Sequence, residues 1–182
     1  CAQGGLAAAM GDDDDPSLHL ADTLTAGDGL CDRAMASRIL HAAPGAIEAL
    51  AAFGVRFDRT PQGRLSLGLE AAHSRRRIIH AGGDGSGREI MRALVAAVRS
   101  TPSITVVEGM EACRLAVADN AIQGVWVSGP TGHASFGAHR VVLATGGIGG
   151  LFFETTNPIR NCGQGLALAA HAGAIFADLE FI

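Results

Sequence analysis

Apolar residues recur every three or four positions along several stretches of the chain, a spacing that predicts amphipathic helices. The predicted helices run from a cap at Ser17 to about Gly27, from Asp32 to Gly54, from Ser86 to about Val98, and from about Gly165 to His171. In the second helix Met35, Ile39 and Leu40 recur at helical spacing, and Pro44-Gly45 should bend its path. Ser86 and Glu89 stand at the spacing of a capping box. The buried side of the third helix is predicted to be Ile90, Met91, Leu94, Val95, Ala97 and Val98.

Continuous or alternating apolar runs predict strands in the second half of the chain. The predicted strands cover residues 104–107, 112–118, 122–127, 136–144 and 141–145. Turn residues between them indicate an antiparallel meander, and its last strand leads into the glycine-rich segment Gly146–Gly150. Residues 55–69 are predicted to form a loop with a turn at Thr60–Gly63. The order of elements predicts an α/β domain with an antiparallel insertion.

Composition narrows the class of protein. The chain has 182 residues, 48% of them hydrophobic, and a net charge of −4, which predicts a folded globular protein. Its apolar runs are far shorter than the roughly 18–20 residues of a membrane-spanning helix, and its basic residues are scattered. Neither a membrane protein nor a nucleic-acid binder is therefore expected. The four cysteines form no CxxC pair, which favours a reducing cytoplasm.

Lysine is absent, because all 14 basic residues are arginine, and tyrosine is absent too. A Schiff base with pyridoxal phosphate and a phosphate loop of the GxxxxGK[ST] type both need lysine, so both are excluded. No metal site is expected. The chain also lacks GxGxxG, so any ADP-binding βαβ unit should precede Cys1. Because the chain starts with Cys1 and stops in what looks like a strand, we expect an internal piece of a longer protein, with a complete small domain as the alternative.

Three polar segments are candidates for ligand binding. Asp12–Asp15 lacks the alternating ligands and the closing glutamate of a calcium loop, so we expect a solvated surface loop. The glycines of residues 82–87 lead into a helix N-terminus, which could hold an anion or form a tight turn. The densest polar cluster, which suits a dicarboxylate or a pyrophosphate, contains His73, Arg75, Arg76, Arg77 and His80. One or two of its arginines should form internal ion pairs or ligand contacts, and the others should face water.

Five segments, in order, resemble the L-aspartate oxidases, a family within the succinate dehydrogenase and fumarate reductase flavoproteins. They are Ala2–Gly5, Asp22–Asp32, Glu70–Asp84, Ala144–Gly147 and Thr155–Pro158. The first and fourth segments occur across that superfamily, whereas Glu70–Asp84 resembles the aspartate oxidases in particular. The resemblance implies that residues 1–182 are an internal part of an FAD-binding, Rossmann-like domain with a β-meander insertion. The ADP-binding βαβ unit, the capping domain and the C-terminal helical domain would lie outside the chain.

The resemblance also implies a cofactor site for FAD. The residues implied to bind it are Ala2, Gln3, Gly4, Gly5, Ala112, Ala144, Thr145, Gly146 and Gln164. The first four would lie along the flavin, Ala112 would meet the adenine, and residues 144–146 would lie beside the pyrophosphate and ribose. Gln164 stands where the family usually has an aspartate that contacts the flavin, so it would hydrogen-bond without bringing a charge.

Glu70 is implied to face the ammonium group of aspartate and thereby to select an amino acid over its deaminated analogue. Ala71 and Ala72 follow it where glycines are common, so this loop should be less free to adopt unusual backbone angles.

The implied activity of the complete protein is FAD-dependent oxidation of L-aspartate to iminoaspartate, with fumarate as a further small-molecule substrate. It would serve quinolinate and NAD biosynthesis, with quinolinate synthase as a partner, and the chain alone should be inactive. The alternatives are a succinate- or fumarate-using flavoprotein, which would lack Glu70, and a non-catalytic binding module.

Overall fold

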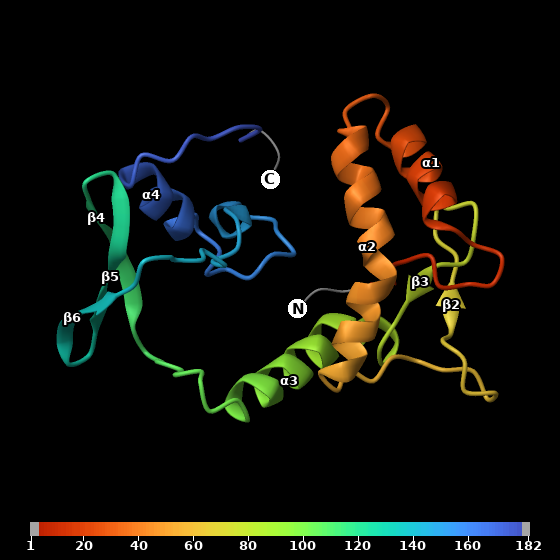
Figure 1. The fold of residues 1–182 in the computed structure, drawn as a ribbon, viewed down its shortest axis with the longest axis horizontal. Coiled ribbons are helices and arrows are strands. Elements are labelled where there is room, and N and C mark those ends of the chain that lie inside the picture. The colour runs from red at the N-terminus through yellow and green to blue at the C-terminus, as the bar shows by residue number, and fades with distance from the viewer. Residues whose placement is uncertain (1–3, 180–182) are drawn as a thin grey trace. The chain divides into compact units, whose positions relative to one another are not determined.

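The computed structural model describes residues 4–179, which divide into two compact units, with the boundary between Ile104 and Thr105. In Figure 1 the first unit carries the colours from red to green and the second those from green to blue. Within the described residues, no helix combines the length and the apolar character that crossing a membrane requires.

The first unit combines helices with a small antiparallel sheet. Its helices are α1 (Pro16–Ala26), α2 (Arg33–Ala52) and α3 (Ser86–Arg99), and a short 3-10 helix, Gly83–Gly85, leads into α3. Its strands are β1 (Leu6–Ala7), β2 (Leu67–Gly68) and β3 (Ile78–Ile79), with β3 in the middle of the sheet. α1 and α2 pack against each other. The predicted helices are confirmed, and Gly63 donates its N–H to the carbonyl of Thr60 in the predicted turn.

The N-terminal caps of these helices only partly match the prediction. Asp32 caps α2 as predicted, because its carboxylate accepts the N–H of Met35 at 2.9 Å. α1 is capped by Asp15, whose carboxylate accepts the N–H of Ser17, so the predicted cap at Ser17 is wrong. The capping box at Ser86 is wrong as well, because this hydroxyl accepts the N–H of Ala81 and α3 has Gly85 at its cap position without a side-chain hydrogen bond.

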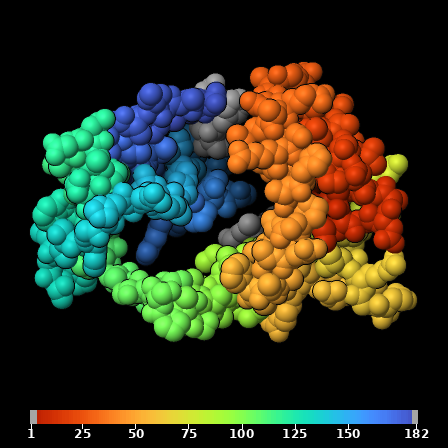
Figure 2. Space-filling model, in the orientation of Figure 1, coloured from red at the N-terminus to blue at the C-terminus, as the bar shows by residue number. Residues whose placement is uncertain are grey.

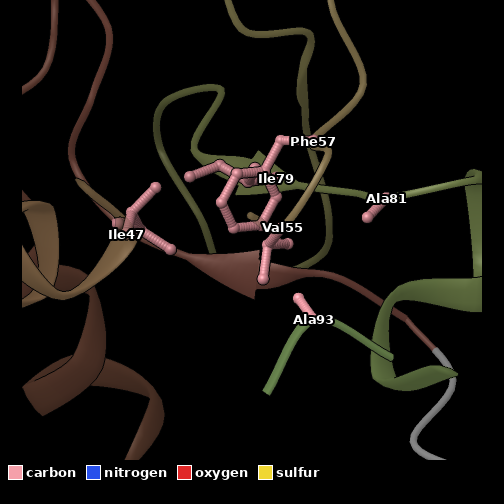
Figure 3. Close-up of a cluster of buried hydrophobic side chains, with 7 residues drawn as sticks. Ile47, Val55, Phe57, Ile79, Ala81 and Ala93 are labelled. Atoms are coloured by element: carbon pink, nitrogen blue, oxygen red, sulfur yellow. The ribbon is translucent and has the colours of Figure 1, made fainter. Parts of the chain in front are cut away.

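The hydrophobic core of the first unit lies where the sheet, α2 and α3 meet. Figure 3 shows Ile47 of α2 and Ala93 of α3 on either side of Val55, Phe57 and Ile79. The predicted buried side of α3 is partly wrong, because Met91 and Val95 are exposed. In α2, the helically spaced Met35 and Ile39 are exposed as well. α2, orange in Figure 2, is accordingly visible along the surface of its unit.

The second unit is built on a three-stranded antiparallel meander. Its strands are β4 (Glu111–Ala118), β5 (Ala121–Gly129) and β6 (Gly132–Gly137), and its helix is α4 (Gln164–His171). Asp119 and Asn120, with φ of 50° and 57°, form the two-residue turn between β4 and β5. α4 packs against β4, and Leu115, Val127 and Leu168 are buried. The mixed helix-and-strand class and the meander are confirmed.

Three strand predictions in this half of the chain are wrong. The third strand of the meander covers Gly132–Gly137 and not residues 136–144, while residues 104–107 and 141–145 belong to no strand. Ile104, Val107 and Val142 are exposed. A strand needs a neighbour for its N–H and C=O groups, and within residues 4–179 neither segment pairs with one.

Candidate functional site

An open pocket of about 670 Å³ lies in the second unit, where β4, the segment around Thr145 and the start of α4 meet. Its lining residues are Met110, Glu111, Ala112, Thr145, Ile159, Arg160, Cys162, Gln164 and Leu168. Three predicted FAD-binding residues, Ala112, Thr145 and Gln164, therefore share one pocket although they come from separate segments. Its volume is typical of a site for a small organic ligand.

Glycines let the segments around this pocket approach closely. A Cβ on Gly165 would meet the side chain of Thr145, so only glycine allows α4 to begin so close to that segment. Gly146 has a φ of +74°, and a Cβ there would lie 2.8 Å from the side-chain amide of Asn161. The predicted residues Ala144 and Gly146 are exposed and flank Thr145 without lining the pocket.

The pocket offers both apolar and polar contacts. Met110, Ile159 and Leu168 supply apolar atoms, while Glu111 and Arg160 add opposite charges. This combination suits a flat aromatic ring with a polar edge. Arg160, Cys162 and Glu111 line the pocket but were not among the residues predicted to bind FAD. The sequence held a signal for two of them. Arg160 closely follows the Thr155–Pro158 motif, and Glu111 precedes the predicted residue Ala112.

In the first unit, Gly5 precedes β1 and lies beside β3. A Cβ at this position would collide with the side chain of Ile78 and would lie 2.8 Å from the carbonyl oxygen of Ile79. Packing of β1 on β3 therefore requires glycine here, whether or not a cofactor is near. Gly4 has a φ of +96°. The predicted residues Ala2 and Gln3 lie outside the described residues.

Glu70 lies on the loop that joins β2 to β3. The base of this loop is closed by the hydrogen bond from the Arg77 N–H to the Gly68 carbonyl, at 3.0 Å. The side chain of Glu70 is exposed, and its carbonyl accepts the N–H of His73 at 3.3 Å. Ala72 has a φ of +66°, so the loop adopts a left-handed backbone angle despite the alanine, at a cost of about 1–2 kcal/mol.

The arginine cluster contains one buried ion-pair network. Arg77 forms two hydrogen bonds of 2.8 Å with the carboxylate of Asp14 and a third of 2.8 Å with Asp22. The side chains of Arg77 and Asp14 are fully buried. The prediction of one internal arginine is confirmed, whereas the prediction of a solvated acidic loop is wrong for Asp14. Asp12 and Asp13 do reach solvent, and they pair there with exposed arginines.

His19 of α1 is buried beside this network. Its ring meets the ring of His73 edge to face, with centroids 5.3 Å apart, and its Nδ1 atom has no hydrogen-bond partner. Burial, together with the positive charge of Arg77 and the neighbouring His73, lowers the pKa of His19. This histidine is therefore held neutral at physiological pH.

The glycine loop before α3 already binds an anion, and that anion belongs to the protein. The carboxylate of Asp58 accepts the N–H groups of Gly82 and Gly83 at 2.9 and 3.0 Å. These two hydrogen bonds lower the pKa of Asp58, and the hydrogen bond from Gly83 has the larger effect. Of the two readings of this segment, the structure favours the tight turn. Among residues 4–179, no group of three or more histidine, cysteine, aspartate or glutamate side chains is arranged to hold a metal ion.

Comparison with known proteins gives the class of the chain. Residues 1–182 match the model of the FAD binding domain family, so the chain belongs to that family and its cofactor is FAD. The structure is similar to that of a quinol fumarate reductase variant of E. coli, with a TM-score of 0.88 and 26% identity over 93% of this chain and 29% of that chain. The expected fold class is thereby confirmed.

Curated proteins that are similar to the chain include L-aspartate oxidases. The chain is 60% identical to the L-aspartate oxidase of Mesorhizobium japonicum and 59% identical to that of Agrobacterium fabrum, in each case over 100% of this chain. It spans 35% of the length of each of these relatives. The resemblance to L-aspartate oxidases is confirmed, while the roles of individual site residues and the domain boundaries stay predictions.

Proposed function

We propose that the complete protein oxidises L-aspartate to iminoaspartate with FAD, and that this chain supplies part of the cofactor site and the residue that selects the substrate. The observation that carries the proposal is the 60% identity to an L-aspartate oxidase along the whole chain. The chain alone should be inactive, because it spans 35% of that relative.

The pocket of the second unit fits part of FAD. The pocket suits an adenosine group in its volume, its apolar side chains and its polar rim. Because Gly165 has no side chain, Thr145 can lie next to the start of α4. In this proposal Ala112 and Thr145 hold the adenine and ribose side of the cofactor, whereas Gln164 and the backbone of Gly4 and Gly5 contact the flavin. When bound, FAD supplies the chemistry of accepting a hydride and passing electrons to oxygen or fumarate.

Glu70 is proposed to recognise the ammonium group of aspartate. Its exposed position on the loop between β2 and β3 leaves the carboxylate accessible to a ligand. A carboxylate beside an ammonium group makes a charge-assisted hydrogen bond that succinate or fumarate cannot make. The proposal also places the protein in the cytoplasm, with quinolinate synthase as the partner that consumes iminoaspartate. Both follow from the proposed activity alone.

A second candidate is a flavoprotein that acts on succinate or fumarate. The similarity to quinol fumarate reductase, with a TM-score of 0.88, favours it. The two candidates make opposite demands on Glu70, because a dicarboxylate without an amino group gains nothing from a nearby carboxylate.

Glu70→Gln in the complete, flavin-loaded protein distinguishes the candidates. Loss of a hydrogen bond to a charged group costs about 1.5–3 kcal/mol, so kcat/KM for L-aspartate should fall roughly 10- to 150-fold. Fumarate reduction should be unchanged.

The control for this experiment is Glu48→Gln, which removes an exposed glutamate of α2. It should leave both activities unchanged. Equal aspartate oxidation by Glu70→Gln and by the unsubstituted protein would refute the role of Glu70. Absence of aspartate-dependent flavin reduction in the unsubstituted protein would refute the proposed function itself and leave the fumarate-using alternative.

A further inference from the structure

The loop that carries Glu70 needs more than its base to hold it in place. Residues 69–77 join β2 to β3, and both strands are only two residues long. One hydrogen bond, from the Arg77 N–H to the Gly68 carbonyl, closes the base. The left-handed backbone angle at Ala72 is strained for an alanine, and this strain destabilises the loop conformation. A strained backbone of this kind persists only where its surroundings fix it.

Asp22 of α1 fixes the far side of the loop. One of its oxygens, Oδ2, accepts the N–H of Ser74 at 2.8 Å, the hydroxyl of Ser74 at 2.8 Å and Nη1 of Arg77 at 2.8 Å. The backbone and the side chain of the same loop residue are thus held by one carboxylate. Since Ser74 lies four positions after Glu70, the anchored stretch is short.

The anchor is itself held rigidly. The guanidinium of Arg77 shares its remaining donors with Asp14, and both of those side chains are fully buried. The side chain of Asp22 is 17% exposed, so water screens its hydrogen bonds only in part. The hydrogen bonds from Ser74 and the charge of Arg77 lower the pKa of Asp22, which keeps the carboxylate ionised at neutral pH.

We infer that Asp22 and Ser74 are positioning residues that hold the loop of Glu70 in the conformation that selects the substrate. This inference rests on the proposed function of Glu70. The Oδ2 atom of Asp22 already accepts three hydrogen bonds from Ser74 and Arg77, so we expect Asp22 to act on the substrate through the loop. Its removal should therefore affect the use of L-aspartate through Glu70 and through no other route.

Hydrogen exchange tests the anchor without any substrate. In the complete, flavin-loaded protein, Asp22→Asn weakens the acceptor of the Ser74 N–H, so amide exchange in residues 69–76 should quicken about tenfold or more. Asp28→Asn is the matched control, because it removes the same charge from the end of α1 and Asn tolerates the positive φ of 45° found there. Unchanged exchange in Asp22→Asn would overturn the inference.

A double-mutant cycle tests the coupling to Glu70. Asp22→Asn should lower kcat/KM for L-aspartate about tenfold when Glu70 is present, and less than about twofold in the Glu70→Gln background. Fumarate reduction should stay unchanged throughout. Ser74→Ala should behave like Asp22→Asn. Ser74→Thr keeps the hydroxyl and should therefore retain the activity of the unsubstituted protein. If Asp22→Asn does not fold, the comparison of Ser74→Ala with Ser74→Thr decides the question.

The outcomes distinguish the role of Asp22 from the role of Glu70. Equal losses from Asp22→Asn in both backgrounds would mean that the anchor acts on general stability and not on selection, which would overturn the inference. If Glu70→Gln alone leaves aspartate oxidation intact, the proposed role of Glu70 fails and the positioning role fails with it. Hydrogen exchange would still report in that case whether Asp22 holds the loop.

Discussion

Replacing Arg77 with methionine should destabilise the first unit strongly. The guanidinium of Arg77 is fully buried and neutralises the equally buried carboxylate of Asp14. It also pairs with Asp22 at 2.8 Å. Arg77→Met leaves the Asp14 carboxylate buried without a cation, and methionine cannot donate a hydrogen bond to it.

The size of the effect follows from this burial. Removing one partner of a buried ion pair costs about 3–5 kcal/mol, because the remaining charge stays desolvated. The chain spans 35% of the length of the Mesorhizobium japonicum relative, and the shift in Tm per kcal/mol becomes smaller as a protein becomes longer. Arg77→Met should therefore lower the free energy of unfolding by about 3–5 kcal/mol, and Tm falls with it. An exposed pair would contribute at most about 1 kcal/mol.

Thermal unfolding followed by far-UV circular dichroism measures this loss, because α1, α2 and α3 of the first unit supply most of the helix in the described residues. The matched control is Arg64→Met, which breaks the pair with Asp12, whose side chains are 77% and 85% exposed. The control should change stability by less than about 1 kcal/mol. Equal Tm shifts in Arg64→Met and Arg77→Met would refute the reasoning.

Two further predictions follow from the pocket and from the buried histidine. Gly165→Ala should lower FAD affinity and cost about 1–3 kcal/mol of stability, because the added Cβ collides with Thr145. The control is Gly137→Ala at the end of β6, where a Cβ meets nothing within 4 Å, and it should retain FAD in a flavin titration. Because burial lowers the pKa of His19 below its ordinary 6.5, stability should be full above about pH 6.5 and decline as pH falls towards the folded-state pKa. Urea midpoints of His19→Gln between pH 7.5 and 5 should vary less with pH than those of the unsubstituted protein, and equal slopes would contradict the prediction.

The helices could be predicted from the sequence because their hydrogen bonds are local. Asp32 caps α2 through a hydrogen bond to a residue three positions on, which a pattern of neighbours captures. The capping box at Ser86 failed because other partners compete for the same groups. The hydroxyl of Ser86 accepts the N–H of Ala81, and the carboxylate of Glu89 pairs with Arg92 on the same helix and with the distant Arg56. The capping-box spacing reveals neither the nearby competitors nor the distant one.

The strands were less predictable because a strand depends on its neighbour. Residues 112–118 and 122–127 have each other as partners across the Asp119–Asn120 turn, so their pattern was sufficient. Residues 104–107 and 141–145 have equally apolar patterns, but within the described residues no strand pairs with them. Hydrophobicity identifies a segment suited to a sheet without identifying its partner.

The candidate site shows the same division between local and distant contacts. Resemblance predicted Ala112, Thr145 and Gln164 as binding residues, and all three line one pocket, although no spacing rule would have joined them. It could not identify the contacts of Arg77, since its partners Asp14 and Asp22 lie 63 and 55 positions away. A run of four aspartates looks like a solvated surface, and only the fold reveals which carboxylate is buried.

The buried pair also lets stability be separated from selection. Replacing both members of a buried ion pair by apolar residues is often neutral or stabilising, so Asp14→Leu combined with Arg77→Met should recover much of the stability lost in Arg77→Met alone. Asp22 would still lack its arginine, however, and its hold on the loop of Glu70 would be weakened. The double variant should therefore approach the unsubstituted Tm while discriminating less well between L-aspartate and fumarate. Recovery of both properties together would mean that the pair serves stability alone.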